Sequence, residues 1–164
     1  MISVENLSFG YPGGDFRLTI PSLNLQPGEK VAVVGPSGTG KTTLLNLIAG
    51  IVVPSRGCVR LGDDVISDMT DSARRALRAA RIGFVFQDFA LLEYLSAREN
   101  ILFPYRIAAG AKLDGEARAR ADRLAASCGL EGKLGRRPGA LSQGEQQRVA
   151  LCRALVMQPQ IVLA

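Results

Sequence analysis

The feature that most constrains the fold is the segment from Gly35 to Thr42, which reads Gly-Pro-Ser-Gly-Thr-Gly-Lys-Thr. It fits the pattern G-x-x-x-x-G-K-[ST] at every fixed position, between an apolar run at 31–34 and a second one at 44–49. This is the strand–loop–helix context of a phosphate-binding loop. Its glycines let successive N–H groups point at a phosphate, and the helix N-terminus adds about half a positive charge. The alternative is an ordinary glycine-rich turn.

Two side chains at the end of this segment supply what the backbone lacks. The Lys41 ammonium brings a full positive charge to the phosphates, and the Thr42 hydroxyl can reach a magnesium ion. The pattern by itself leaves kinases, GTPases and ATPases open.

Composition narrows the class of protein. The 164 residues, 47% of them hydrophobic, are enough for one folded domain, and no run approaches the ~18 apolar residues of a membrane span. The N-terminus carries no signal-peptide pattern. Cys58, Cys128 and Cys152 have no metal-ligand spacing and fit reduced thiols. The net charge of +5 comes from arginine clusters with few aromatic residues among them, which argues against a nucleic-acid partner.

Alternating strands and helices predict an α/β sheet with a helical insertion from roughly residue 89 to 139. A helix is expected at 143–157, and the last expected strand follows it. Ser96 begins a helical stretch with a capping box. We expect strands at 2–9, 16–25, 30–34, 82–86 and 161–164, a small hairpin at 58–66, and further helices at 71–80 and 114–127.

A second motif, Leu141-Ser142-Gln143-Gly144-Glu145, precedes the last helix. It resembles the signature L-S-G-G-Q of the nucleotide-binding domain of ABC transporters, from which Gln143 and Glu145 depart. Glu145 followed by Gln-Gln-Arg-Val resembles the branch that powers lipoprotein release and macrolide-type export. Ser142-x-x-Glu145 is also a capping box, and both interpretations can hold together because a capped helix N-terminus presents amides to a phosphate.

The resemblance implies roles for further residues. In that family the signature contacts ATP held on the opposite subunit. Gln87, which follows a predicted strand, resembles the glutamine that touches the magnesium ion or the attacking water. Tyr11 resembles the aromatic residue that stacks on adenine, with Phe9 as the rival position. The implied catalytic residues are Lys41 and Gln87, the metal ligands are Thr42 and Gln87, and the ATP-binding set is Tyr11, Gly35, Pro36, Ser37, Gly38, Thr39, Gly40, Lys41, Thr42 and Thr43.

The same resemblance implies an organisation for the chain. The expected fold is a P-loop NTPase with a mostly parallel core sheet, an N-terminal antiparallel β part and an inserted helical subdomain. Residues 1–88 would form the β-rich and phosphate-loop core, 89–139 the helical subdomain, and 140–164 the signature helix and the start of a strand. In the family this strand leads to an Asp-Glu pair, which we expect beyond Ala164. Residues 1–164 should therefore bind ATP but hydrolyse it poorly, as an incomplete nucleotide-binding domain.

The implied function is the ATP-binding and hydrolysing subunit of an ABC transporter. Its cofactors would be ATP and Mg²⁺, and its partners a second ABC ATPase subunit and transmembrane permease subunits, with no nucleic acid. It would lie peripherally on the cytoplasmic side of the cell membrane. The alternatives are a non-transport ABC-type ATPase in DNA repair, chromosome handling or translation, a small-molecule kinase, and a non-catalytic dimerisation module.

Overall fold

The computed structural model describes residues 1–164. The chain forms two compact units, residues 1–75 and residues 76–164, and each is described by itself. None of the helices is both long and apolar enough to cross a membrane.

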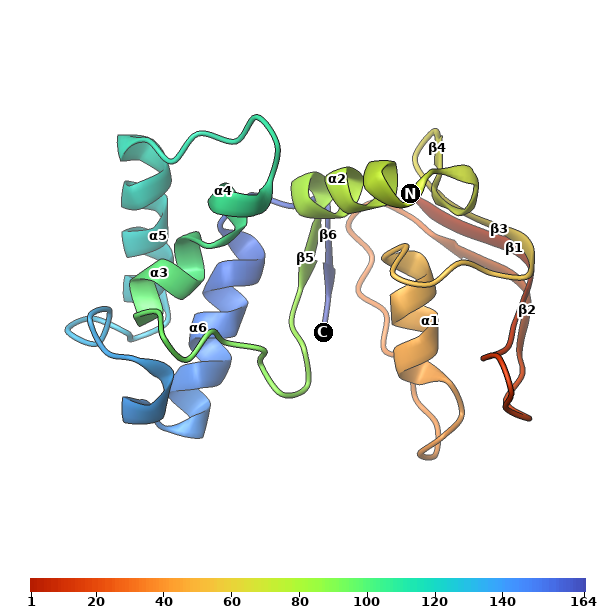
Figure 1. Ribbon diagram of the computed structural model, residues 1–164, viewed down its shortest axis with the longest axis horizontal. Coiled ribbons are helices and arrows are strands. Elements are labelled where there is room, and N and C mark those ends of the chain that lie inside the picture. Colours follow the sequence, from red (N-terminus) through yellow and green to blue (C-terminus); the bar gives the residue numbers. More distant parts are fainter. The chain divides into compact units, whose positions relative to one another are not determined.

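The first unit is built on an antiparallel sheet in the order β2-β1-β3-β4 (Figure 1). Its register places Ile2 beside Leu25 on one side and beside Leu61 on the other. Alternating apolar residues of β1, among them Val4, turn one face of the sheet inward. The predicted strand at 2–9 is confirmed, the strand at 16–25 begins two residues later than predicted, and the hairpin at 58–66 forms with its second strand ending at Val65. The strands are β1 (Ile2–Phe9), β2 (Leu18–Leu25), β3 (Arg56–Leu61) and β4 (Asp64–Val65).

Helix α1 (Lys41–Ile48) buries one face in the core of this unit. Leu47 and Ile48 on the helix, Val59 on β3 and Ile66 are all almost fully buried. Ile66 opens a short 3-10 helix, Ile66–Asp68, and α2 (Asp71–Arg81) follows as the sequence predicts. The C-terminal end of the phosphate-binding segment is therefore fixed, because it continues into a helix whose buried face packs in the core.

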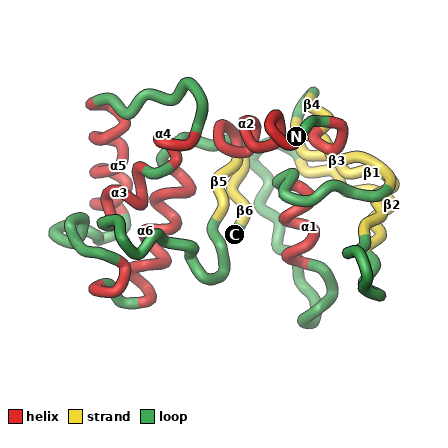
Figure 2. The backbone as a smooth tube through the Cα atoms, viewed as in Figure 1, coloured by secondary structure: helices red, strands yellow, loops and turns green.

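The prediction of a buried strand over Lys30–Val34 is wrong for this structure. The segment is drawn as loop in Figure 2 and makes no ladder with another strand. Val31, Val33 and Val34 are 55%, 44% and 88% exposed. A β-branched run favours extended backbone, but a strand forms only when a neighbour pairs with its N–H and C=O groups. No strand of residues 1–164 provides that pairing.

The second unit joins two parallel strands to a helical cluster. Ile82 pairs with Ile161 and Phe84 with Leu163, so the strand predicted at 82–86 is two residues shorter than expected. Leu130, Val149 and Val156 are fully buried at the centre of the helices. The elements are β5 (Ile82–Phe84), α3 (Ala97–Leu102), α4 (Pro104–Ile107), α5 (Gly115–Ser127), a 3-10 helix (Pro138–Ala140), α6 (Gln143–Leu155) and β6 (Ile161–Leu163).

Hydrogen bonds fix the part of the chain that leads into α3. The capping box predicted at Ser96 is present, with the Glu99 carboxylate accepting from the Ser96 amide. Asn100 is fully buried, and its side chain accepts from the Leu92 amide and donates to the carbonyls of Leu92, Leu95 and Ser96. Because each of these buried groups has a partner, the turn before α3 has a defined conformation.

Candidate functional site: a phosphate-binding loop and a capped helix

The phosphate-binding loop ends in left-handed backbone that only glycine adopts easily. Gly38 has φ 83° and Gly40, the N-cap of α1, has φ 97°. A Cβ at Gly40 would lie 2.8 Å from Cζ of Phe16, so the Phe16 ring would have to move to admit a side chain there. These two glycines turn the chain directly into the helix.

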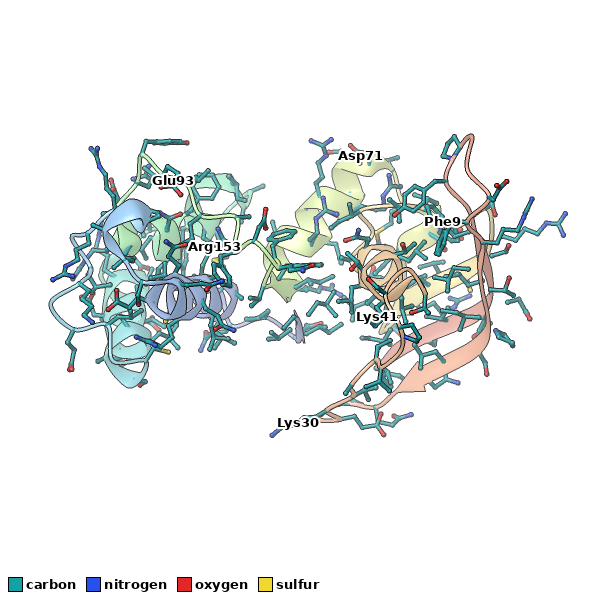
Figure 3. All side chains as sticks on the ribbon, turned by 90° about the horizontal axis from the view of Figure 1, so that it is seen from below. Phe9, Lys30, Lys41, Asp71, Glu93 and Arg153 are labelled. Carbon is teal, nitrogen blue, oxygen red and sulfur yellow. The ribbon has the colours of Figure 1, made fainter.

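Lys41 lies at the start of α1 (Figure 3) and reaches back over the loop. Its Nζ donates to the carbonyl oxygens of Gly35 and Pro36, each at 2.7 Å. The Thr39 hydroxyl donates to the same Pro36 oxygen at 2.9 Å. The loop is therefore closed around a cation, and the ammonium is held where a phosphate oxygen could replace the carbonyls as its partner.

The N-terminus of α1 has the chemistry of an anion site. Gly40 offers no side chain to cap the helix, and no acidic residue occupies the first turn. The first amides are thus left for an exogenous acceptor, and the helix dipole favours a negative charge there. Residues Gly35 to Thr39 are exposed, as is Thr42.

The protein residues can bind a magnesium ion only when phosphate groups supply its other ligands. No group of three or more His, Cys, Asp or Glu side chains could hold a metal in residues 1–164. Mg²⁺ commonly takes one or two protein ligands together with substrate phosphates and water. The exposed hydroxyl of Thr42, beside the phosphate loop, is suited to that arrangement.

Tyr11 lies against the same helix. Its hydroxyl is 3.3 Å from Oγ1 of Thr43, and its ring meets Phe9 edge-on with the centroids 4.9 Å apart. Tyr11 is 43% exposed, whereas Phe9 is 8% exposed. Of the two aromatic candidates, only Tyr11 offers a ring that a flat base can reach.

The signature segment forms the capped start of α6. Ser142 is the N-cap, its Oγ accepts from the Glu145 amide, and the Glu145 carboxylate accepts from the Ser142 amide at 2.8 Å. The capping-box interpretation is therefore confirmed. Leu141 is buried, while Ser142, Gln143 and Gly144 are exposed. An exposed serine and glycine at a helix N-terminus can meet a phosphate that comes from outside this unit.

Glu145 is held by a partner that the sequence motifs do not reveal. Lys133, from the loop before the 3-10 helix, donates to Glu145 Oε1, while the second carboxylate oxygen binds the Ser142 amide. The Lys133 hydrogen bond, followed by the one from the Ser142 backbone, lowers the pKa of Glu145 to about 2. The side chain of Glu145 is therefore ionised and occupied within its own subunit.

Gln87 follows β5 in an exposed turn. The Val85 amide donates to the Leu163 carbonyl and extends the pairing with β6, and the Phe89 amide closes the turn on the Phe86 carbonyl. Gln87 is exposed at this carboxyl end of the parallel pair, where sheets of this kind place their ligands.

Arg153 of α6 donates to two backbone carbonyls of this turn, those of Phe89 and Ala90, and no sequence pattern predicted this contact. It lies 64 residues from Phe89 and 63 from Ala90, and its guanidinium reaches both backbone oxygens. Like Lys133, it is recognised only when distant segments are packed together. The phosphate loop and Tyr11 belong to residues 1–75, and Gln87 and the signature belong to residues 76–164.

Comparison with known proteins gives one consistent answer. A sequence model of the ABC transporter family matches residues 18–164. The lipoprotein-releasing system ATP-binding protein LolD of Pseudomonas syringae pv. tomato is 43% identical over 166 residues, which is 99% of this chain and 72% of that protein. The macrolide export ATP-binding/permease protein MacB of Syntrophobacter fumaroxidans is 43% identical over 167 residues, which is 100% of this chain and 23% of that protein.

Solved structures agree with the sequence relatives. The dimeric post-hydrolysis state of the ATP-binding cassette MJ0796, bound to ADP and Pi, superimposes with a TM-score of 0.89 at 36% identity, covering 100% of this chain and 73% of that one. The α/β fold class of a P-loop NTPase is thereby confirmed, with parallel pairing here limited to β5 and β6. The chain is an ATP-binding domain of the ABC transporter family.

Proposed function

We propose that this protein couples the binding and hydrolysis of ATP to transport through membrane partner subunits. The observation that carries the proposal is the exposed phosphate loop at the start of α1, with Lys41 closed over the carbonyls of Gly35 and Pro36. Its helix N-terminus has neither a capping side chain nor an acidic residue to compete with a phosphate. The identity of 43% to an ATP-binding protein of a lipoprotein-releasing system supports the transport assignment.

The proposed residue roles follow the chemistry of each position. Lys41 and the amides of the loop bind the β- and γ-phosphates, and Tyr11 stacks on the base. Thr42 and Gln87 hold the magnesium ion, which supplies charge neutralisation when bound. Ser142 and the other exposed signature residues contact the ATP of a second subunit.

We also propose a location and an assembly. The protein lies peripherally on the cytoplasmic side of the cell membrane, binds transmembrane permease subunits and pairs with a second ABC ATPase subunit. The ATP-binding cassette MJ0796 is described as dimeric, which supports the pairing. Nucleic acid is not among the proposed partners.

Mixing two inactive variants tests the shared ATP site. Lys41→Ala removes the phosphate ligand from one side of each site, and Ser142→Arg blocks the other side with a bulky side chain. In the full-length protein with its membrane partner, Lys41→Ala should have less than about a tenth of the wild-type ATP turnover, as expected when a charged phosphate ligand is lost. Ser142→Arg should also have low turnover, because the arginine side chain obstructs the phosphate of the opposite subunit. In a mixed dimer, one site carries both changes and the other is intact, so mixing should restore part of the turnover.

The matched control is Lys30→Ala, which removes an exposed lysine outside the loop. It should leave turnover at the wild-type level. No recovery on mixing, from variants shown to form mixed dimers, would contradict the shared site. Full activity of Lys41→Ala would contradict the assignment of the phosphate loop.

A further inference from the structure

We propose that Arg153 is a positioning residue that ties the segment following Gln87 to the signature helix, so that the two move as one element during ATP turnover. The inference rests on the proposed function. Arg153 would join two parts of the second unit that have different proposed roles: Gln87 in the turn after β5, and Ser142 at the start of α6.

The Arg153 guanidinium donates hydrogen bonds to two successive backbone carbonyls. Arg153 Nη1 donates to the carbonyl of Ala90, and Nη2 donates to the carbonyl of Phe89, both at 2.6 Å. A guanidinium is planar and presents its donors in a fixed geometry, so binding two neighbouring acceptors fixes their relative orientation. A lysine could not impose the same constraint.

The backbone at Phe89 and Ala90, whose carbonyls Arg153 binds, is strained. Phe89 has φ 61° and Ala90 has φ 44°, in the left-handed region that residues with a Cβ avoid. Neither position is a glycine, so the conformation has to be held by surrounding contacts. Arg153 supplies such a contact at both residues, and the Phe89 amide supplies another by closing the turn on Phe86.

The partial burial and the charge of the Arg153 guanidinium favour these hydrogen bonds. Arg153 is partly buried on α6, the helix that Figure 3 shows with this side chain labelled. Burial lowers the pKa of Arg153 from its ordinary value, and the nearby Asp88 carboxylate opposes that shift. The side chain remains charged because an arginine pKa starts so high. Two charge-assisted hydrogen bonds, a partly buried one to Phe89 and an exposed one to Ala90, are therefore available to hold the turn.

A second contact joins the same helix to the other side of Gln87. A Cβ at Gly83 in β5 would lie 2.3 Å from the backbone oxygen of Ala154, so strand and helix are in direct backbone contact there. Gly83 precedes Gln87 and Phe89 follows it, and their partners on α6 are adjacent residues. The exposed Gln87 turn is thus held at both ends by one turn of α6.

The signature lies at the opposite end of that helix. Ser142 caps α6, and Arg153 is eleven positions further on, which corresponds to about 16 Å along a helix at 1.5 Å per residue. An α-helix of 13 residues transmits displacement as a rigid element. A movement of the Gln87 segment would therefore displace the signature, and binding at the signature would restrain the Gln87 segment.

The first test uses the full-length protein with its membrane partner. Arg153→Met keeps the length of the side chain and removes its donors. We expect kcat for ATP to fall at least about tenfold because both hydrogen bonds that position the Gln87 turn are lost, with KM for ATP changed less than about twofold because the phosphate loop is untouched. Arg153→Lys, which keeps a donor without the fork, should fall between wild type and Arg153→Met.

The matched control is Arg120→Met. Arg120 lies on α5 and donates to three oxygens: Glu116 Oε1 at 2.7 Å, the Tyr105 hydroxyl at 2.7 Å and the Val156 carbonyl at 3.4 Å. The Val156 carbonyl lies at the far end of α6 from Ser142. It does not contact the Gln87 turn. An equal loss of kcat in Arg120→Met would overturn the proposal, because it would show that any weakening of the helical cluster has the same effect.

The second readout does not depend on activity. Amide hydrogen exchange at residues 87–91 should rise at least about tenfold in Arg153→Met, since local opening follows the loss of its restraint, and stay unchanged in Arg120→Met. Adding Ala90→Gly to Arg153→Met should recover part of the lost kcat, because glycine adopts the left-handed conformation without help. Unchanged exchange in Arg153→Met would overturn the contact itself.

These outcomes separate the two proposals. If the wild-type protein does not hydrolyse ATP, the proposed function fails, while the exchange measurement still tests the link. If wild type and Arg120→Met are active and Arg153→Met shows an equal kcat with altered exchange, the link exists but carries no role in turnover, and the inference is overturned.

Discussion

At the scale of single residues, Glu145 illustrates how one side chain serves two structural purposes. It stands where the family signature usually has glutamine, and it closes the capping box of α6 through the Ser142 amide. Its other oxygen accepts from Lys133. Both interactions require the ionised carboxylate, so they stabilise the folded protein only while Glu145 is charged.

This arrangement predicts a dependence of stability on pH. The folded-state pKa of Glu145, about 2, lies below the ordinary value of 4.5, so its contribution is complete above 4.5 and is lost as the pH falls from 4.5 to 2. Glu145→Gln should therefore be less stable than wild type at pH 7, with the difference shrinking as the pH is lowered through that window. Urea unfolding at several pH values measures it.

The exposed Glu131 provides the control. Glu131→Gln should stay close to wild type at pH 7. A stability difference for Glu145→Gln that does not diminish below pH 4.5 would show that the carboxylate charge is not what stabilises the start of α6.

At the scale of secondary-structure elements, the contact between β5 and α6 depends on a missing side chain. Because a Cβ at Gly83 would lie 2.3 Å from the Ala154 oxygen, Gly83→Ala must push the strand and helix apart. Overpacking of this kind costs about 1–3 kcal/mol. The midpoint of urea unfolding should fall accordingly, whereas Gly135→Ala, where a Cβ would meet nothing within 4 Å, should change it little. Equal midpoints for the two variants would contradict the backbone contact.

The elements that the sequence predicts well are those that short-range contacts determine. The capping boxes at Ser96 and Ser142 involve residues three positions apart, and both are present. The phosphate loop is equally local. The segment at 30–34 could not be predicted in the same way, because an extended run becomes a strand only through partners elsewhere in the sheet.

Long-range side-chain contacts could not be predicted either, because they too depend on partners that are distant in the sequence. Lys133 meets Glu145 across 12 positions, and Arg153 meets Phe89 across 64. Nothing in the local pattern around either residue distinguishes it from an arginine or lysine on a solvated helix face. Only the folded second unit shows that Lys133 binds Glu145 of the signature and that Arg153 binds the turn containing Gln87.

At the scale of the whole molecule, the assignment joins motifs from both units. The phosphate loop belongs to residues 1–75 and the signature helix to residues 76–164, so neither unit contains the complete set of proposed ATP contacts. The family sequence model covers residues 18–164, which include both motifs. We therefore propose that ATP binds this chain through the loop that Lys41 closes.

Equilibrium binding of ATP to the full-length protein tests that claim most directly. Lys41→Ala removes a charged phosphate ligand and should raise the Kd at least about tenfold, since one such interaction is equivalent to about 1.5 kcal/mol or more. Lys30→Ala should bind as wild type does. We expect tight binding by wild type and Lys30→Ala and weak binding by Lys41→Ala, and equal affinity in all three proteins would contradict the assignment of the phosphate loop.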